Sequence, residues 1–247
     1  MFLSTTGLIL RETQYKESSK ILTVLTAAEG KLTVTARGAV RRNSKLAAST
    51  QLLVFSEMTL FSSRDRWTLT EARSIEQFSG LQNDVASLAL GSYFAELAEA
   101  VSDEDSPNPE LLPLCLNALF ALSEGIKTHL YIKPAFELRL MAVSGFAPLI
   151  SHCARCGRVE PEHAYLDLEG GTLYCDSCSV ADSAPLSRAA LSAARYIIGC
   201  DAKKLLSFSL EGEVLRELAS ASEQYLLIQL DRRFRTLEFY KGLGIRD

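Results

Sequence analysis

Residues 21–38, ILTVLTAAEGKLTVTARG, contain two β-rich runs on either side of a short loop, Ala27–Gly30, that ends in glycine. Two such runs around a glycine-containing loop are typical of a β-hairpin. In the second run apolar and polar residues alternate, which predicts a strand with one apolar face and one polar, basic face. The apolar positions are Leu32, Val34 and Ala36, and the polar positions are Lys31, Thr33, Thr35 and Arg37.

Three further β-rich runs surround this hairpin. TGLILRET (6–13) precedes it, and QLLVFSEMTLF (51–61) and RWTLTEARSI (66–75) follow it, joined by the short link 62–65. Five short strands within about 75 residues are consistent with a small closed barrel such as an OB-fold. The N-terminal part of the chain is therefore predicted to be a five-stranded OB-fold barrel.

Beyond Ile75 the spacing of apolar residues becomes helical, recurring every four residues from Val85 to Val101. Further helical patterns occupy the stretch that ends near Leu122, the passage that begins at Lys133, and the regions after Ser187 and Glu211. We predict an α+β fold. The expected domains are an OB-fold DNA-binding domain at 1–78 and a helical domain at 79–247, with a zinc-binding insert at about 150–182.

Four cysteines form two pairs in the pattern Cys153-x2-Cys156-x18-Cys175-x2-Cys178. This spacing lies within the class that indicates a four-cysteine zinc site. Cysteines three positions apart can direct both sulfurs at one ion, and two such pairs complete a tetrahedron. The intervening AYLDLEGGTLY has strand character on each side of 170–171, which predicts a hairpin that brings the pairs together. We predict that these four cysteines bind one structural Zn²⁺.

Redox and catalytic alternatives fit the cysteines less well. A thioredoxin-type motif uses a single pair near a βαβ unit, and a zinc deaminase needs an H-x-E pattern that 163–165 does not match. Catalytic zinc keeps an open coordination position, which four thiolates close. His152 or His163 could replace a ligand, but we expect both to be exposed loop residues. We expect Cys115 and Cys200 to be small core residues.

Basic residues gather in the N-terminal part of the chain. Residues 1–80 carry a net charge of +4 and residues 81–247 one of −8, which together give −4. In an OB-fold the face of strands 2 and 3 and the loops 1–2 and 4–5 bind nucleic acid, although a charged surface can also be merely solvated. The candidate DNA-binding residues are Lys16, Lys20, Lys31, Arg37, Arg41, Arg42, Lys45, Arg64 and Arg66.

Aromatic residues suited to base stacking are few on this predicted surface. Thr33 and Thr35 occupy the strand face where an aromatic platform would lie. Tyr15 could stack on a base, whereas Trp67 and Phe61 are expected in the core. This pattern favours binding that follows the phosphate backbone with little sequence preference.

Several classes of function are not indicated by the sequence. No apolar run approaches 18 residues and the N-terminus has no basic leader, so we expect a cytoplasmic, nucleoid-associated protein without a membrane span. In that reducing compartment six cysteines argue against a disulfide scaffold. The sequence contains no Walker loop, G-x-S-x-G or H-E-x-x-H motif, and we therefore expect no enzymatic activity.

The chain resembles the RecO family of bacterial DNA-repair proteins over its whole length. The resemblance is carried by GLILRETQYKESSKILTVLTAAEGKLTVTARGAVRRNSK (7–45), FELRLMAVSGFAPLISHCARCG (136–157) and YCDSC (174–178), in this order and spacing. It implies an N-terminal OB-fold, a helical body and a zinc-binding insert. Some members of the family lack these cysteines, which agrees with a structural role for the metal.

The resemblance also implies a function without catalysis. Members of the family bind single- and double-stranded DNA, anneal complementary strands, and act with RecR to load RecA onto DNA covered by single-stranded-DNA-binding protein. The resemblance implies that the C-terminal tail of that protein docks on the helical domain. A second hypothesis is a zinc-ribbon adaptor whose partners are proteins and whose basic face is incidental.

Overall fold

The computed structural model describes residues 1–64, 66–104 and 106–244. The chain divides into two compact units. Of the described residues, the first unit comprises those within Met1–Glu124 and 234–244, and the second comprises Gly125–Arg233. The first unit contains helices as well as the barrel. This division into units therefore does not test the domain boundary predicted at residue 78, which stays a prediction.

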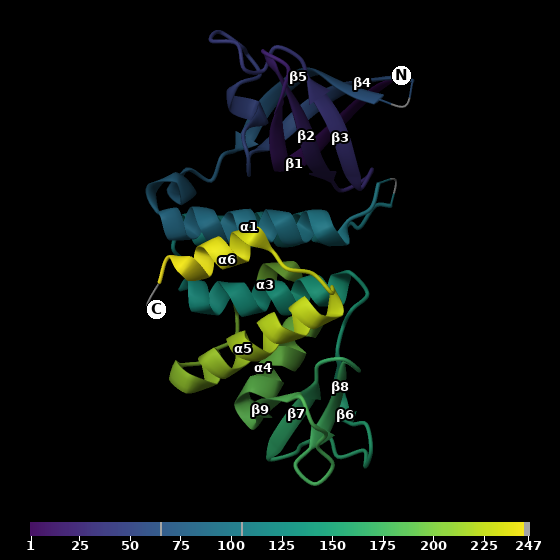
Figure 1. Cartoon of the computed structure of the whole chain (residues 1–247), viewed down its shortest axis with the longest axis vertical. Helices are drawn as coiled ribbons and strands as arrows, with labels where there is room; N and C mark the ends of the chain where they lie inside the picture. The colour runs from purple at the N-terminus through teal and green to yellow at the C-terminus, as the bar shows by residue number, and fades with distance from the viewer. Residues whose placement is uncertain (65, 105, 245–247) are drawn as a thin grey trace. The chain divides into compact units, whose positions relative to one another are not determined.

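A closed five-stranded barrel forms the beginning of the first unit (Figure 1). The order around the barrel is β1-β2-β3-β5-β4, and β4 pairs back with β1. β3 and β5 are parallel, whereas the other neighbours are antiparallel. The predicted OB-type barrel and its hairpin at 21–38 are confirmed. The strands are β1 (Phe2–Tyr15), β2 (Ser19–Thr26), β3 (Lys31–Ala36), β4 (Phe55–Ser63) and β5 (Arg66–Glu76).

The interior of the barrel is filled by the apolar face of each strand. Leu32, Val34 and Ala36 are buried in this core, as the alternation in β3 predicts. Trp67 packs against the same core, which confirms its predicted place. Phe61 does not, because its neighbour Leu60 takes the inward position and leaves Phe61 on the outer face with 37% of its surface exposed. The prediction of a core position for Phe61 is therefore wrong.

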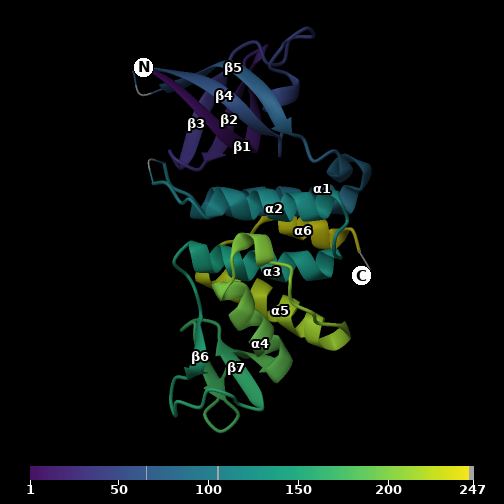
Figure 2. The ribbon, with the colours of Figure 1, turned by 180° about the vertical axis from the view of Figure 1, so that it is seen from behind.

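Helices α1, α2 and α6 complete the first unit (Figures 1 and 2). Asp84 caps the start of α1 by accepting hydrogen bonds from the backbone N–H groups of Ala86 and Ser87, at 3.2 and 2.9 Å. Helix α6 lies alongside α1, and the ring of Phe234 meets that of Tyr93 edge-on, with 5.9 Å between centroids. The bounds are η1 (Ala48–Thr50), η2 (Ser79–Asn83), α1 (Val85–Val101), α2 (Leu111–Ser123) and α6 (Arg235–Gly242).

The second unit combines helices with a small four-stranded sheet. The sheet order is β6-β8-β7-β9, and β7 and β8 form the predicted hairpin around Gly170 and Gly171. Ser187 caps α4 by accepting a 3.3 Å hydrogen bond from the backbone N–H of Ala190. The α+β class with a cysteine-bearing insert is confirmed. The elements are α3 (His129–Val143), β6 (Leu149–Cys153), β7 (His163–Asp167), β8 (Thr172–Cys175), β9 (Ser183–Ser187), α4 (Arg188–Gly199), η3 (Ala202–Lys204) and α5 (Gly212–Gln229).

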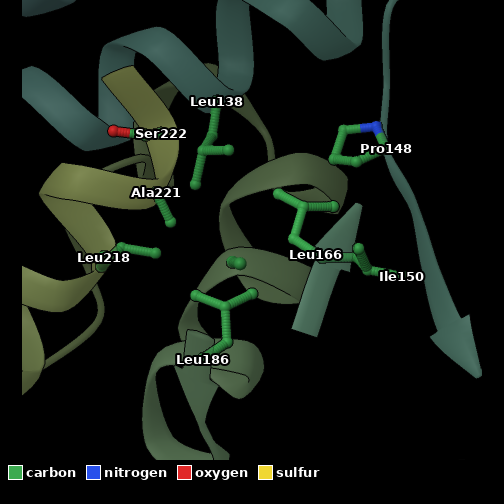
Figure 3. A pocket seen from close by; sticks show the side chains of 9 residues that line it. Leu138, Pro148, Ile150, Leu166, Leu186, Leu218, Ala221 and Ser222 are labelled. Atoms are coloured by element: carbon green, nitrogen blue, oxygen red, sulfur yellow. The ribbon is translucent and has the colours of Figure 1, made fainter. Parts of the chain in front are cut away.

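An apolar cavity lies where the sheet meets the helices of this unit. Figure 3 shows Leu138 of α3, Leu166 of β7, Leu186 of β9 and Leu218 of α5 around it. Its volume of about 10 Å³ is about the minimum that one water molecule needs, and its lining is almost wholly apolar. The cavity is a packing void of the core and does not suit a ligand.

No described helix combines the length and the apolar composition needed to cross a membrane.

Candidate metal centre and nucleic-acid interface

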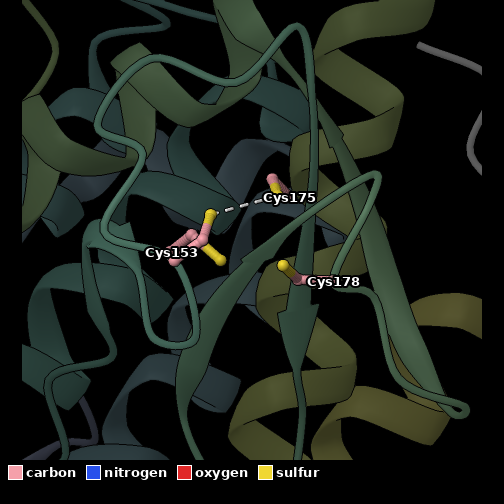
Figure 4. Close-up of side chains that lie close together, drawn as sticks. Cys153, Cys175 and Cys178 are labelled. Carbon is pink, nitrogen blue, oxygen red and sulfur yellow. Dashed lines mark hydrogen bonds between the residues drawn. The ribbon is translucent and has the colours of Figure 1, made fainter.

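The four predicted metal ligands converge at one place in the second unit. Their Sγ atoms all lie within 4.8 Å of one another, and none forms a disulfide. Cys153, Cys175 and Cys178 are buried, whereas Cys156 is exposed. Figure 4 shows the sulfurs of the three buried cysteines directed toward a common centre.

The spacing of the sulfurs fits a single tetrahedral ion. Zn–S bonds of about 2.3 Å place the sulfurs of a regular tetrahedron about 3.8 Å apart. The Sγ atoms of Cys156 and Cys175 are 3.6 Å apart. Local turns build this arrangement, since the backbone N–H of Gly157 donates to the carbonyl oxygen of Cys153 at 2.9 Å while Gly157 adopts a φ of 75°. Four sulfurs at one ion leave no position for a substrate.

Burial and hydrogen bonding shift the pKa values of two of the four thiols in opposite directions. Burial acts to raise the pKa of the Cys153 thiol, but hydrogen bonds from backbone N–H groups, first that of Cys156, lower it to about 6. Burial and the neighbouring sulfurs raise the pKa of the Cys178 thiol to about 12. A cation bound by all four sulfurs would offset the mutual repulsion of their ionised forms.

Arg195 of α4 holds the segment that carries the first cysteine pair. Its Nε donates to the carbonyl oxygen of Ile150 at 2.8 Å. One Nη donates to the carbonyl oxygens of Ser151 and Val159 at 2.9 and 2.7 Å. The other Nη lies 3.1 Å from a carboxylate oxygen of Glu160. Both ends of the segment 150–159 are thus fixed to one helix, a role that nothing in the sequence signals.

The histidines and the remaining cysteines lie outside the metal cluster. His152 and His163 are exposed, as predicted, but neither lies in a loop, because His152 belongs to strand β6 and His163 begins strand β7. Cys115 and Cys200 are buried, as predicted. Burial raises the pKa of the Cys115 thiol to about 12, as expected for a core residue.

Five of the nine predicted DNA-binding residues gather at one end of the barrel, where the β1–β2 loop meets the β3–β4 connection. The backbone N–H of Val40 donates to the carbonyl oxygen of Ser18 at 3.1 Å and thereby joins the two segments. All five side chains are exposed, and none has an ion-pair partner within the described part of the chain. This group, the cation cluster, consists of Lys16, Arg37, Arg41, Arg42 and Lys45.

Two of the predicted lysines are engaged in contacts within the first unit. Lys20 forms an ion pair with Glu12 and retains only 17% side-chain exposure. The Nζ of Lys31 donates to the carbonyl oxygen of Glu99, in the last turn of α1, at 3.0 Å. A cation at this end complements the helix dipole. Both contacts compete with phosphate binding.

An acidic segment covers the beginning of β3. The carboxylate of Glu104 accepts a 2.9 Å hydrogen bond from the hydroxyl of Thr33. The backbone N–H of Lys31 donates to the carbonyl oxygen of Asp103 at 3.3 Å. The polar face of β3 is therefore partly covered at the end near Lys31, whereas the end near Arg37 is exposed.

Arg64 and Arg66 lie at the β4–β5 turn, apart from the cation cluster. Because β3 and β5 are parallel, with Val34 opposite Trp67, the start of β5 lies beside the middle of β3. The cation cluster follows the end of β3. Both arginines are exposed. Seven of the nine predicted residues thus form two exposed groups. The other two, Lys20 and Lys31, contact other residues of the first unit.

Comparison with known proteins gives matches to both parts of the chain. Residues 1–78 match the family described as Recombination protein O N terminal, and residues 82–238 match Recombination protein O C terminal. A relative from Acetivibrio thermocellus named DNA repair protein RecO is 33% identical over 244 residues, which cover 98% of this chain and 97% of the relative. A relative of the same name from Alkaliphilus metalliredigens is 30% identical over 247 residues, covering 98% and 100%. The chain therefore belongs to the Recombination protein O (RecO) family.

Proposed function

We propose that this chain is a recombination mediator in DNA repair that binds DNA through its barrel and acts without catalysis. The cation cluster carries the proposal. It gathers five exposed cations that have no ion-pair partner among the described residues, on the barrel that matches the N-terminal RecO family. The relatives' printed name, DNA repair protein RecO, supports the same assignment.

The proposed ligand of the cation cluster is the phosphate backbone of DNA, single- or double-stranded. Arginine and lysine side chains on two adjoining loops can neutralise successive phosphates of a flexible strand. Neutralised strands repel one another less, so a protein that covers two complementary strands in this way favours their annealing. Lys20 and Lys31 stay in the proposed set, but their contacts with Glu12 and Glu99 lead us to expect smaller contributions.

The proposed partners follow from membership of the family. With RecR, the protein would load RecA onto DNA covered by single-stranded-DNA-binding protein, whose C-terminal tail would dock on the helical part of the chain. This work would take place in the cytoplasm, at the nucleoid. We assign no residue to the tail or to RecR.

We further propose that the four cysteines bind one structural Zn²⁺. The convergence of four sulfurs within 4.8 Å and the closed donor set support this choice. The ion would supply the positive charge that four thiolates require. Arg195 would hold the first cysteine pair in position, and the β7–β8 hairpin would present the second cysteine pair.

An annealing assay with labelled complementary oligonucleotides tests the proposed function. We expect annealing by the wild-type protein, its loss at high salt, and its loss in the triple variant Arg37→Glu, Arg41→Glu, Arg42→Glu. The double variant Lys203→Glu, Lys204→Glu is a matched control, because these exposed lysines lie in the second unit. Wild-type protein that neither binds nor anneals DNA would favour the alternative, a zinc-ribbon adaptor between proteins.

A further inference from the structure

Two phenylalanine rings form an exposed pair on the outer face of the barrel. Phe2 of β1 is 68% exposed and Phe61 of β4 is 37% exposed. Their ring centroids are 5.0 Å apart, with an interplanar angle of 50°. The two residues are direct partners across the β1–β4 pairing, so the strands themselves fix the arrangement. A paired aromatic surface held open to solvent is suited to contact a flat apolar ligand.

Arginine side chains adjoin this aromatic pair. In the β4–β5 pairing Phe61 lies opposite Thr68, and Ser63 lies opposite Arg66. Residues 66 and 68 share one face of β5, which makes Arg66 a diagonal neighbour of Phe61, within reach of a long side chain. Arg64 begins the same turn and is also exposed. The sequence places Asp65 between the two arginines, outside the described residues, so the turn carries a net charge of +1.

The same outer face continues from the aromatic pair to the cation cluster. Thr68 of β5 lies opposite Thr35 of β3, and β3 ends at Ala36, directly before Arg37 of the cation cluster. The band therefore crosses four strands, from Phe2 through Phe61 to β3. At about 4.8 Å between neighbouring strands it extends about 14 Å along the sheet. Its middle is lined by threonines, which are small and uncharged.

We propose that Phe2 and Phe61 form a base-stacking site for single-stranded nucleic acid, with Arg64 and Arg66 binding the adjacent phosphates. Aromatic faces accept any base, because every base presents a π-face, and guanidinium groups bind the backbone beside it. The occupant is thus an anionic polymer with unpaired flat rings. The inference rests on the proposed function, and it adds a contact with bases to what is otherwise phosphate binding.

A comparison of two oligonucleotides separates stacking from phosphate binding. One is a fluorescein-labelled oligo-dT, and the other has the same length and phosphates but only abasic sites. We expect Phe61→Ala to weaken binding of oligo-dT by about tenfold and to leave binding of the abasic strand unchanged. Phe61→Trp restores the affinity for oligo-dT, because the indole offers a larger stacking face. Phe239→Ala, at a phenylalanine on α6 that is 57% exposed, has no effect on either oligonucleotide.

The double variant Arg41→Glu, Arg42→Glu distinguishes this inference from the proposed function. We expect it to weaken binding of both oligonucleotides. If it does so while Phe61→Ala binds oligo-dT as tightly as wild type, the stacking site is overturned and the proposed function stands. Equal losses of Phe61→Ala on both oligonucleotides also overturn the site, because bases then play no part. Wild-type protein that binds neither oligonucleotide contradicts the proposed function itself.

Discussion

The Nε of Arg195 donates a 2.8 Å hydrogen bond to the carbonyl oxygen of Ile150, and it thereby fastens helix α4 to the strand that leads into the first cysteine pair. The same guanidinium binds two further carbonyl oxygens in the segment 150–159. The positions of two proposed metal ligands thus depend on a side chain more than thirty residues further along the chain.

Replacing this arginine tests its role in positioning the metal ligands. We expect Arg195→Gln to lower the affinity for Zn²⁺ by about 10- to 100-fold, the usual effect of losing a group that orients ligands. Competition with a chelating dye at neutral pH measures the affinity. Arg188→Gln is the control, because Arg188 contacts Glu160 from the same helix and shows, among the described contacts, no hydrogen bond to a carbonyl oxygen of the segment 150–159. Equal affinities of the two variants would refute the role of Arg195.

We expect removal of the proposed Zn²⁺ to have a local effect. Without the proposed ion, the cysteine-bearing sheet would lose the link between its two cysteine pairs, whereas the barrel would keep its own apolar core. We expect a strong chelator to speed amide hydrogen exchange in 149–187 by at least about tenfold and to leave exchange in β1–β5 unchanged. Re-addition of Zn²⁺ reverses the change. Exchange in β6–β9 that is unaffected by chelation would rule out a structural metal.

Lys133 forms a buried ion network that joins α3 to α5. Its Nζ lies 2.7 Å from a carboxylate oxygen of Glu137 and 2.9 Å from one of Glu223. Burial acts to lower the pKa of Lys133, but the two carboxylates raise it above its ordinary value, so the ammonium is charged at neutral pH. Lys133→Met leaves both carboxylates without this cation, and we expect the second unit to lose about 3–5 kcal/mol of unfolding free energy.

Denaturant unfolding followed by hydrogen exchange in α3 and α5 measures this loss within the second unit. Lys203→Met removes an exposed lysine from the same unit, and we expect it to change stability by no more than about 0.5 kcal/mol. A Lys133→Met protein as stable as this control would show that the network contributes nothing.

The parts of the fold that depend on local periodicity could be predicted from the sequence. Alternation at Leu32, Val34 and Ala36 places the inner face of β3 correctly, and the spacing of the cysteines predicts their convergence. The predicted core position of Phe61 is wrong. Large apolar residues are usually buried, but Phe61 follows the inward-facing Leu60 in β4, and strand alternation therefore turns it outward.

Contacts between distant segments could not be predicted. Lys31 begins β3 and Arg37 follows its last residue, yet of these two cations only Lys31 contacts a helix end, at Glu99. Helix α6 was also missed, because eight residues give little periodic signal and its packing against α1 depends on tertiary contact.

The salt dependence of single-strand binding tests the central claim, that the cation cluster binds the DNA backbone. Each phosphate neutralised contributes about 0.7 to the slope of log affinity against log salt. We predict that Arg41→Gln, Arg42→Gln reduces the slope of oligo-dT binding by about 1.4, while Lys203→Gln, Lys204→Gln leaves it unchanged. Lys31→Gln should alter the slope by less than one arginine does, because its ammonium is bound to Glu99. A slope in the double-arginine variant equal to that of wild type would contradict the claim.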